Sequence, residues 1–253
     1  MIPVNKYVKN LSRIEFVVTM ACTGKCRHCS EGDHGDFSGH IDADVAVESI
    51  RKVCEHYSIA SLMTFGGEAL LYPDVVCAIQ KAAAEAGIEK RQVITNGYFS
   101  KDPERIAEVV RNLKNSEVND LLLSVDAFHQ ESIPLEPVKL FAESAVRSNI
   151  PIRLSPAWLV STQDDNLYNI RTREILKEFA PLGIPIGSGN VIFPSGNALK
   201  YLGEYFAETA DCTNPYDDDP CDIRTLSFGP NGDVLHGNVY HTDILTILKS
   251  YQP

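Results

Sequence analysis

The chain lacks long apolar runs and clusters of basic residues. None of its apolar stretches approaches the length of a membrane-spanning helix, and residues 1–9 lack the apolar core of a secretory leader. The formal net charge of -11 and the scattered positions of Lys and Arg argue against nucleic acid or an anionic membrane surface as a partner. We therefore expect a protein that binds neither nucleic acid nor a membrane.

Two sequence patterns are also absent. No Gly-x-Gly-x-x-Gly motif follows a strand-like run with an acidic residue downstream, which disfavours a doubly wound dinucleotide-binding sheet. The seven cysteines are an odd number in a chain of 253 residues, whereas disulfide frameworks are typical of small, cysteine-dense secreted domains. Unpaired thiols indicate a reducing compartment, so we expect a cytoplasmic protein.

Three of the seven cysteines stand within eight positions. Cys22, Cys26 and Cys29 have the spacing Cys-x3-Cys-x2-Cys. Three thiolates this close on a loop can bind three irons of a cubane iron-sulfur cluster and leave the fourth iron open for chemistry. A zinc site is the alternative, but tetrahedral zinc requires a fourth ligand. The candidates for it are His28, which lies awkwardly between two of the cysteines, and His34.

The cysteine spacing resembles the signature of the radical S-adenosylmethionine (SAM) superfamily, including a ring-bearing residue, His28, directly before the third cysteine. The resemblance implies that Cys22, Cys26 and Cys29 bind a [4Fe-4S] cluster whose unique iron is chelated by the amino and carboxylate groups of SAM. It also implies a reducing partner such as flavodoxin or ferredoxin. One electron then cleaves SAM to methionine and a 5′-deoxyadenosyl radical, which removes a hydrogen atom from the substrate.

From residue 13 onward, strand-like runs alternate with helix-period segments, which is typical of βα units and a parallel sheet. Hydrophobic residues make up 44% of the chain, ample for the core of one large domain. The expected strands are 13–20, 61–65, 92–95, 121–125, 151–160 and an irregular 184–193. The expected helices are 43–57, 73–86, one beginning at Asp102 and Pro103, 138–147 and 170–179. Six units predict an α/β fold, a partial (β/α)6 TIM-like barrel, with its chemistry where the strands end.

A Gly-Gly-Glu motif, Gly66, Gly67 and Glu68, follows the second expected strand. Glycines let the backbone approach a ligand closely, and a carboxylate can pair with an ammonium group. The motif resembles the second motif of the superfamily, whose backbone and acid hold the amino group of SAM. Residues 69–74 continue much as that motif does, with Ala69 in place of the usual proline.

Polar residues also stand at the ends of the next strands. Asn96 is a candidate ligand contact or supporting group after the third strand. Ser124 and Asp126 stand where similar proteins hold the ribose hydroxyls and the methionyl carboxylate of SAM, and a helix or turn cap is the alternative. Many relatives have Ser-x-Asp-Gly here, whereas this chain continues with Ala-Phe-His-Gln at 127–130. Arg153 either binds a carboxylate inside the barrel or is solvated outside it.

The composition changes near residue 205, so we expect a barrel domain, 1–204, and a C-terminal extension, 205–253. Residues 226–235 predict a β-hairpin around Pro-Asn-Gly-Asp. This hairpin resembles the start of the SPASM or Twitch extension of many peptide-modifying relatives. Only Cys212 and Cys221 remain there, against the four or more cysteines that an auxiliary cluster normally takes. We therefore expect a single cluster, although His236 and His241 could complete an unusual second site.

These patterns together predict a radical SAM enzyme that acts on a peptide or a peptide-derived natural product. The alternative substrate is a sugar or nucleoside that is epimerised, dehydrated or decarboxylated in a biosynthetic pathway. A non-enzymatic role in electron transfer or redox sensing is a third hypothesis. It is disfavoured because such roles usually require a fully ligated cluster.

Overall fold

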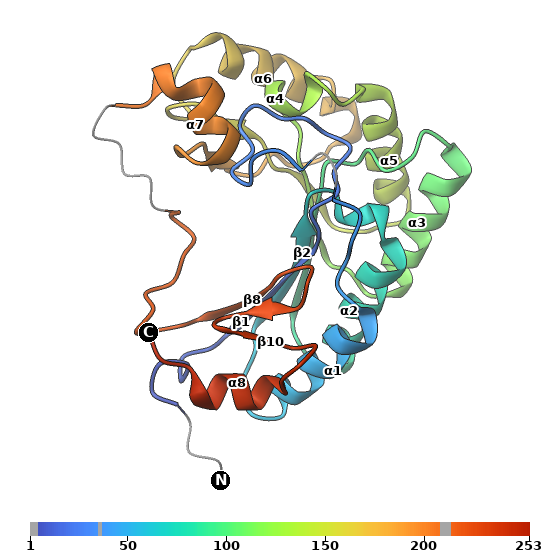
Figure 1. Cartoon of the computed structure of the whole chain (residues 1–253). Coiled ribbons are helices and arrows are strands. Elements are labelled where there is room, and N and C mark those ends of the chain that lie inside the picture. Colours follow the sequence, from blue (N-terminus) through green and yellow to red (C-terminus); the bar gives the residue numbers. More distant parts are fainter. Residues whose placement is uncertain (1–4, 35–36, 208–213) are drawn as a thin grey trace.

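The computed structural model describes residues 5–34, 37–207 and 214–253. Its main sheet has six strands in the order β5-β4-β3-β2-β1-β8, and every neighbouring pair is parallel. These strands are β1 (Arg13–Thr19), β2 (Ser61–Gly66), β3 (Lys90–Thr95), β4 (Asp120–Leu123), β5 (Ile152–Leu154) and β8 (Thr225–Phe228). The sheet curves without closing (Figure 1). This confirms the predicted α/β class and the open partial barrel.

Four helices follow one side of the sheet in Figure 1. They are α1 (Ala43–Cys54), α2 (Pro73–Glu85), α3 (Pro103–Asn115) and α5 (Leu135–Arg147). Each helix buries an apolar stripe, and the stripe of α3 consists of Ile106, Val109, Val110 and Leu113. Asp102 caps α3 by accepting a hydrogen bond from the backbone N–H of Glu104, with Pro103 in the first position, as the sequence predicts.

Strand β1 shows the difference between the two faces of the sheet. Ile14, Phe16 and Val18 are fully buried on the face that the helices cover. The alternate residues, among them Glu15 and Val17, are only half-buried because successive side chains of a strand point to opposite faces. The face opposite the helices is therefore the one that can receive a ligand.

The second half of the barrel is less regular than the first. The expected strand 151–160 is split into β5 and β6 (Ala157–Trp158), because Pro156 has no backbone N–H to donate. Within the expected strand 184–193, β7 (Asn190–Val191) pairs in parallel with β6 in a separate two-stranded sheet. Residues Leu154 and Ile186 form one isolated parallel bridge between the halves.

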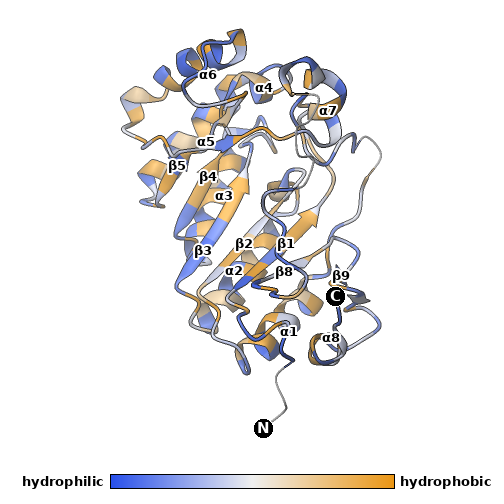
Figure 2. Ribbon diagram, turned by 90° about the vertical axis from the view of Figure 1, so that its left-hand side faces the viewer, coloured by the Kyte–Doolittle hydropathy of each residue, from blue (hydrophilic) through white to orange (hydrophobic). Residues whose placement is uncertain are grey.

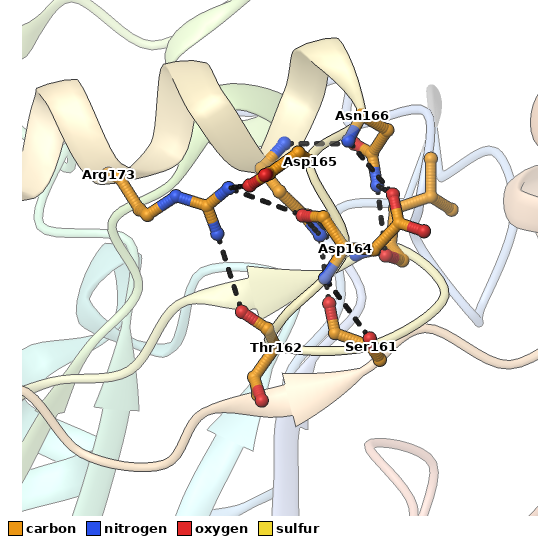
Figure 3. A network of polar contacts seen from close by, with 8 residues as sticks. Ser161, Thr162, Asp164, Asp165, Asn166 and Arg173 are labelled. Carbon is orange, nitrogen blue, oxygen red and sulfur yellow. Dashed lines mark hydrogen bonds and ion pairs between the residues drawn. The ribbon is translucent and has the colours of Figure 1, made fainter.

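A polar network joins the loop of residues 161–166 to α6 (Leu167–Lys177), as Figure 3 shows. Asn166 caps the helix by accepting a hydrogen bond from the backbone N–H of Asn169, so the helix begins three residues earlier than the sequence predicts. Arg173 pairs with Asp165 and donates to the carbonyl oxygen of Thr162 at 3.3 Å. The loop before α6 is thereby held by its own polar groups.

The C-terminal segment adds a strand to the barrel. In β8, Thr225 lies opposite Arg13 and Phe228 opposite Phe16, and the two phenylalanine rings stack at 4.6 Å. The expected hairpin 226–235 is present in part: the backbone N–H of Gly229 donates to Asp233 across the turn at 2.7 Å. The antiparallel ladder itself joins the next two short strands, β9 (Asp233–Val234) and β10 (Gly237–Asn238).

The remaining elements are short. They are the helices α4 (Ala127–Gln130), α7 (Gly196–Leu202) and α8 (Ile244–Ser250) and the 3-10 turns η1 (Ala69–Leu71), η2 (Ala180–Leu182) and η3 (Gly203–Tyr205). Hydrophobic colouring in Figure 2 runs along β2 and β4, which lie inside the sheet and not at its edges. Across the three described ranges, no helix combines the length and apolarity needed to cross a membrane.

Candidate functional site

The cysteine loop directly follows β1, at the carboxyl end of the sheet. Cys22, Cys26 and Cys29 are free thiols. Gly24 lies between two of them: its backbone N–H donates to Cys22 Sγ at 3.3 Å, and a Cβ added to it would lie 3.2 Å from Cys26 Sγ. His34, one of the two candidates for a fourth zinc ligand, lies close to a cysteine: its Nε2 is 3.2 Å from Cys29 Sγ.

Burial disfavours ionisation of all three thiols. Burial raises the pKa of Cys22 to about 11, and burial followed by the negative charge of Asp126 raises the pKa of Cys26 still more. Burial also raises the pKa of Cys29. Without a positive charge beside them these thiols stay protonated, and bound iron is such a charge, because it stabilises the thiolate that ligates it.

His28 lies in the packing between the cysteine loop and α4. Its ring centroid is 5.0 Å from that of Phe128 and 4.8 Å from that of His129. Burial, and then the charge of His129, lower the pKa of His28 to about 4, so its ring is neutral near pH 7. Its Nδ1 is buried without a hydrogen-bond partner. Cys26 Sγ and one ring nitrogen of each histidine lie within 4.8 Å of one another.

Gly66 and Gly67 allow close contact with the backbone that precedes the cysteine loop. Gly66 has a φ of 141°, and a Cβ there would lie 2.2 Å from the carbonyl oxygen of Thr19. A Cβ at Gly67 would lie 2.3 Å from the carbonyl oxygen of Ala21. The backbone N–H of Gly67 donates to Thr19 at 2.8 Å. These glycines therefore fix the position of the loop that begins at Cys22.

The carboxylate of Glu68 is fully buried. Its Oε1 accepts hydrogen bonds from Thr95 Oγ1 at 2.7 Å and from the backbone N–H of Leu70 at 2.9 Å, and its Oε2 accepts from the backbone N–H of Asn96 at 2.7 Å. Burial raises the pKa of Glu68, and these hydrogen bonds oppose that rise. The carboxylate thus joins the loop after β2 to the loop after β3. Its contact with the amino group of SAM stays a prediction.

Asn96 extends this connection to a predicted iron ligand. Its Nδ2 donates to Thr23 Oγ1 at 3.1 Å and lies 3.8 Å from Cys22 Sγ, within the hydrogen-bond range of a sulfur acceptor. The structure thus brings Glu68, Asn96 and Cys22 together through contacts within the chain.

Asp126 has the capping role that the sequence left open. Its Oδ1 accepts from the backbone N–H groups of Phe128 and His129 at the start of α4, and its Oδ2 accepts from His129 Nδ1 at 2.8 Å and from the backbone N–H of Ala157 at 3.0 Å. Burial alone would raise the pKa of Asp126, but the charge of His129 lowers it overall. Asp126 is fully buried and Ser124 half-buried, so of the two Ser124 is better placed to reach a ligand.

Three other residues complete the comparison with the sequence. Arg153 has its carboxylate partner inside the chain, because Asp120 pairs with it at 2.9 and 3.1 Å. Cys221 is exposed, and Cys212 lies outside the described residues, so the expectation of a single cluster stays a prediction. His129 was not predicted as a site residue. Its signal was the Asp-x-x-His spacing, which places His129 one helical turn after Asp126.

Sequence comparison decides the family of the chain. Residues 16–151, more than half of its length, match the sequence model of the Radical SAM superfamily. The chain belongs to the radical SAM superfamily. Members of this superfamily bind a [4Fe-4S] cluster and SAM.

Individual relatives are distant from this member of the radical SAM superfamily. GTP 3',8-cyclase of Clostridium perfringens (strain SM101 / Type A) is 24% identical over 176 residues, which cover 66% of this chain and 52% of the relative. The chain thus spans about half the length of that curated relative. Streptococcus suis SuiB bound to precursor peptide SuiA has a TM-score of 0.59 at 13% identity, over 98% of this chain and 66% of that chain. Native anSMEcpe with bound AdoMet has a TM-score of 0.61 at 12% identity, over 96% and 81%. Both structural likenesses show the fold.

Proposed function

We propose that Cys22, Cys26 and Cys29 bind the [4Fe-4S] cluster and that SAM occupies its open iron beside Gly67. The observation that carries this proposal is the close packing of Gly66 and Gly67 against the backbone of residues 19–21, directly before a loop with three free thiols at the carboxyl end of the sheet. When bound and reduced, the cluster supplies the electron that cleaves SAM to methionine and a 5′-deoxyadenosyl radical.

The chain's own residues bind and orient these groups. The three thiolates bind iron, and Asn96 Nδ2 supports the sulfur of Cys22. The carboxylate of Glu68 keeps Asn96 in place by accepting a hydrogen bond from the backbone N–H of Asn96. Such supporting hydrogen bonds orient metal ligands, and the loss of one typically costs about 10- to 100-fold in metal affinity or activity.

The half-buried middle of the open sheet face is the proposed place for the substrate. Val17 on β1 lies opposite Phe65 on β2, and Ile94 on β3 lies opposite Leu122 on β4. Apolar side chains around a radical exclude water and unwanted hydrogen donors. Val17 and Phe65 stand close to the ends of β1 and β2, which lead into the cysteine loop and the Gly-Gly-Glu motif.

A peptide or peptide-derived compound is the substrate that we propose. The likeness to SuiB supports this choice, because it extends over 98% of the chain and therefore includes the segment after residue 205. A nucleoside or sugar is the second candidate, and the sequence similarity to GTP 3',8-cyclase favours it.

One experiment distinguishes the peptide substrate from the nucleoside or sugar substrate. Extracts of a host strain with and without the gene are compared by mass spectrometry, and the accumulating compound is incubated anaerobically with the reconstituted enzyme, SAM and dithionite. The peptide proposal predicts 5′-deoxyadenosine together with a mass change in a peptide. A mass change in a nucleoside or sugar, with no altered peptide, would overturn the substrate class and keep the radical reaction.

A further inference from the structure

Residues 195–197, at the start of α7, lie against the cysteine loop although about 170 residues separate them in the sequence. The backbone N–H of Asn197 donates to the carbonyl oxygen of Cys29 at 2.9 Å. Its side-chain Nδ2 donates to the carbonyl oxygen of Cys26 at 3.3 Å. One residue thus binds the backbone of two of the three proposed iron ligands.

The side chain of Asn197 also contacts a second point of the cysteine loop. The residue is only 6% exposed, and its Nδ2 also donates to Asp33 Oδ1 at 3.3 Å. An amide NH2 has two donor hydrogens, and both are used here on oxygen acceptors of the cysteine loop. Ser195 adds a third contact, because its hydroxyl donates to the carbonyl oxygen of Ser30 at 3.1 Å.

Gly196 permits this close approach. Its φ is 48°, in the left-handed region, and a Cβ on it would lie 2.3 Å from the carbonyl oxygen of Ser30 and 2.7 Å from that of Cys29. Any other residue would push α7 away from the loop. The contact between α7 and the cysteine loop is therefore specified by three consecutive residues.

We infer that Asn197 is a positioning residue that fixes the distance between the thiols of Cys26 and Cys29, so that the cluster is held tightly. This inference rests on the proposed ligand set. At the other end of the loop, Cys22 is held by Asn96. Residues at the start of α7 thus support Cys26 and Cys29, and the loop after β3 supports Cys22. Loss of Asn197 should loosen two ligands and leave the third in place.

The test compares Asn197→Asp with Lys200→Gln. In Asn197→Asp a carboxylate of nearly the same size faces the Cys26 carbonyl and the Asp33 carboxylate, so two hydrogen bonds become repulsive contacts. Lys200→Gln is the matched control, because Lys200 lies on the same helix and reaches Asp33 at 3.3 Å from an exposed position. The measurements are the rate of iron loss to a chelator under anaerobic conditions, the EPR spectrum of the reduced cluster, and the thermal midpoint of the apoprotein.

Asn197→Asp is expected to lose iron about 10- to 100-fold faster than the wild type, the usual effect of removing a group that supports a metal ligand, with an altered EPR spectrum. Lys200→Gln should match the wild type. Wild-type iron loss and an unchanged EPR spectrum in Asn197→Asp would overturn the inference. If the Asn197→Asp apoprotein has a lowered thermal midpoint, the substitution has impaired folding in general, and Ser195→Ala is tested in its place. Faster iron loss is expected for Ser195→Ala. Iron loss at the wild-type rate would contradict the inference. If Cys26→Ala retains the cluster, the proposed ligand set itself is wrong, which is a separate outcome.

Discussion

The carboxylate of Glu68 accepts a hydrogen bond from the backbone N–H of Asn96 at 2.7 Å, across 28 residues of sequence. The side-chain Nδ2 of the same Asn96 donates to Cys22 Sγ. The acid of the Gly-Gly-Glu motif therefore acts within the protein before any ligand arrives, because it holds two loops of the site together.

Replacement of this carboxylate by an amide should destabilise the protein. In Glu68→Gln an NH2 group replaces one acceptor oxygen, which leaves at least one buried N–H donor facing another donor. We expect the free energy of unfolding of the apoprotein to fall by about 1–3 kcal/mol, together with weaker SAM binding. Urea denaturation and calorimetry measure the two effects. Glu89→Gln, at an exposed position, is the control, and equal unfolding midpoints for Glu68→Gln and the control would refute this role.

The strand β8 should stabilise the whole barrel. Phe228 is fully buried and stacks on Phe16 of β1. Phe228→Ala leaves a cavity at this contact and should lower the free energy of unfolding by about 3–5 kcal/mol. Tyr240→Ala, at a residue 39% exposed, should cost much less. A two-step denaturation curve in which the barrel unfolds independently of the C-terminal segment would contradict this account.

The pair of Asp120 and Arg153 should make stability depend on pH in the acid range. Burial opposes ionisation of Asp120, but the hydrogen bond and charge of Arg153 lower its pKa overall. A carboxyl whose pKa is lowered on folding stabilises the protein above its unfolded pKa of about 3.9 and loses that contribution as the pH falls through its folded pKa. Asp120→Asn should therefore be less stable than the wild type at pH 7, and the difference should shrink toward pH 3. Thermal unfolding at both pH values measures it, and a difference that grows on acidification would contradict the assignment.

Local sequence patterns predicted the first four βα units because the signals for each unit lie in residues that are close together in the sequence. The stripe of α3, its Asp102 cap and the apolar run of β4 need no distant partner to be recognised. The order of the residues also placed the three cysteines and the Gly-Gly-Glu motif at adjacent strand ends, where the structure has them.

Contacts between distant segments were not predictable in the same way. The parallel pairing of Phe228 with Phe16 and the hydrogen bonds from Asn197 to the cysteine loop join residues more than 160 positions apart. The hairpin pattern at 226–235 is local, so it gives no information on the pairing of β8 with the distant strand β1. Asp126 was ambiguous because a carboxylate that caps a turn and one that meets a ligand have the same sequence context.

The central claim, that Cys22, Cys26 and Cys29 bind the catalytic cluster, is tested most directly by an iron determination on anaerobically reconstituted protein. The wild type should contain about four irons per chain and produce 5′-deoxyadenosine from SAM and dithionite. The triple replacement of these cysteines by Ala should abolish both, whereas replacement of Cys54 and Cys77, which pack against the hydrophobic core, should preserve both. A triple variant that retains four irons and still cleaves SAM would contradict the account.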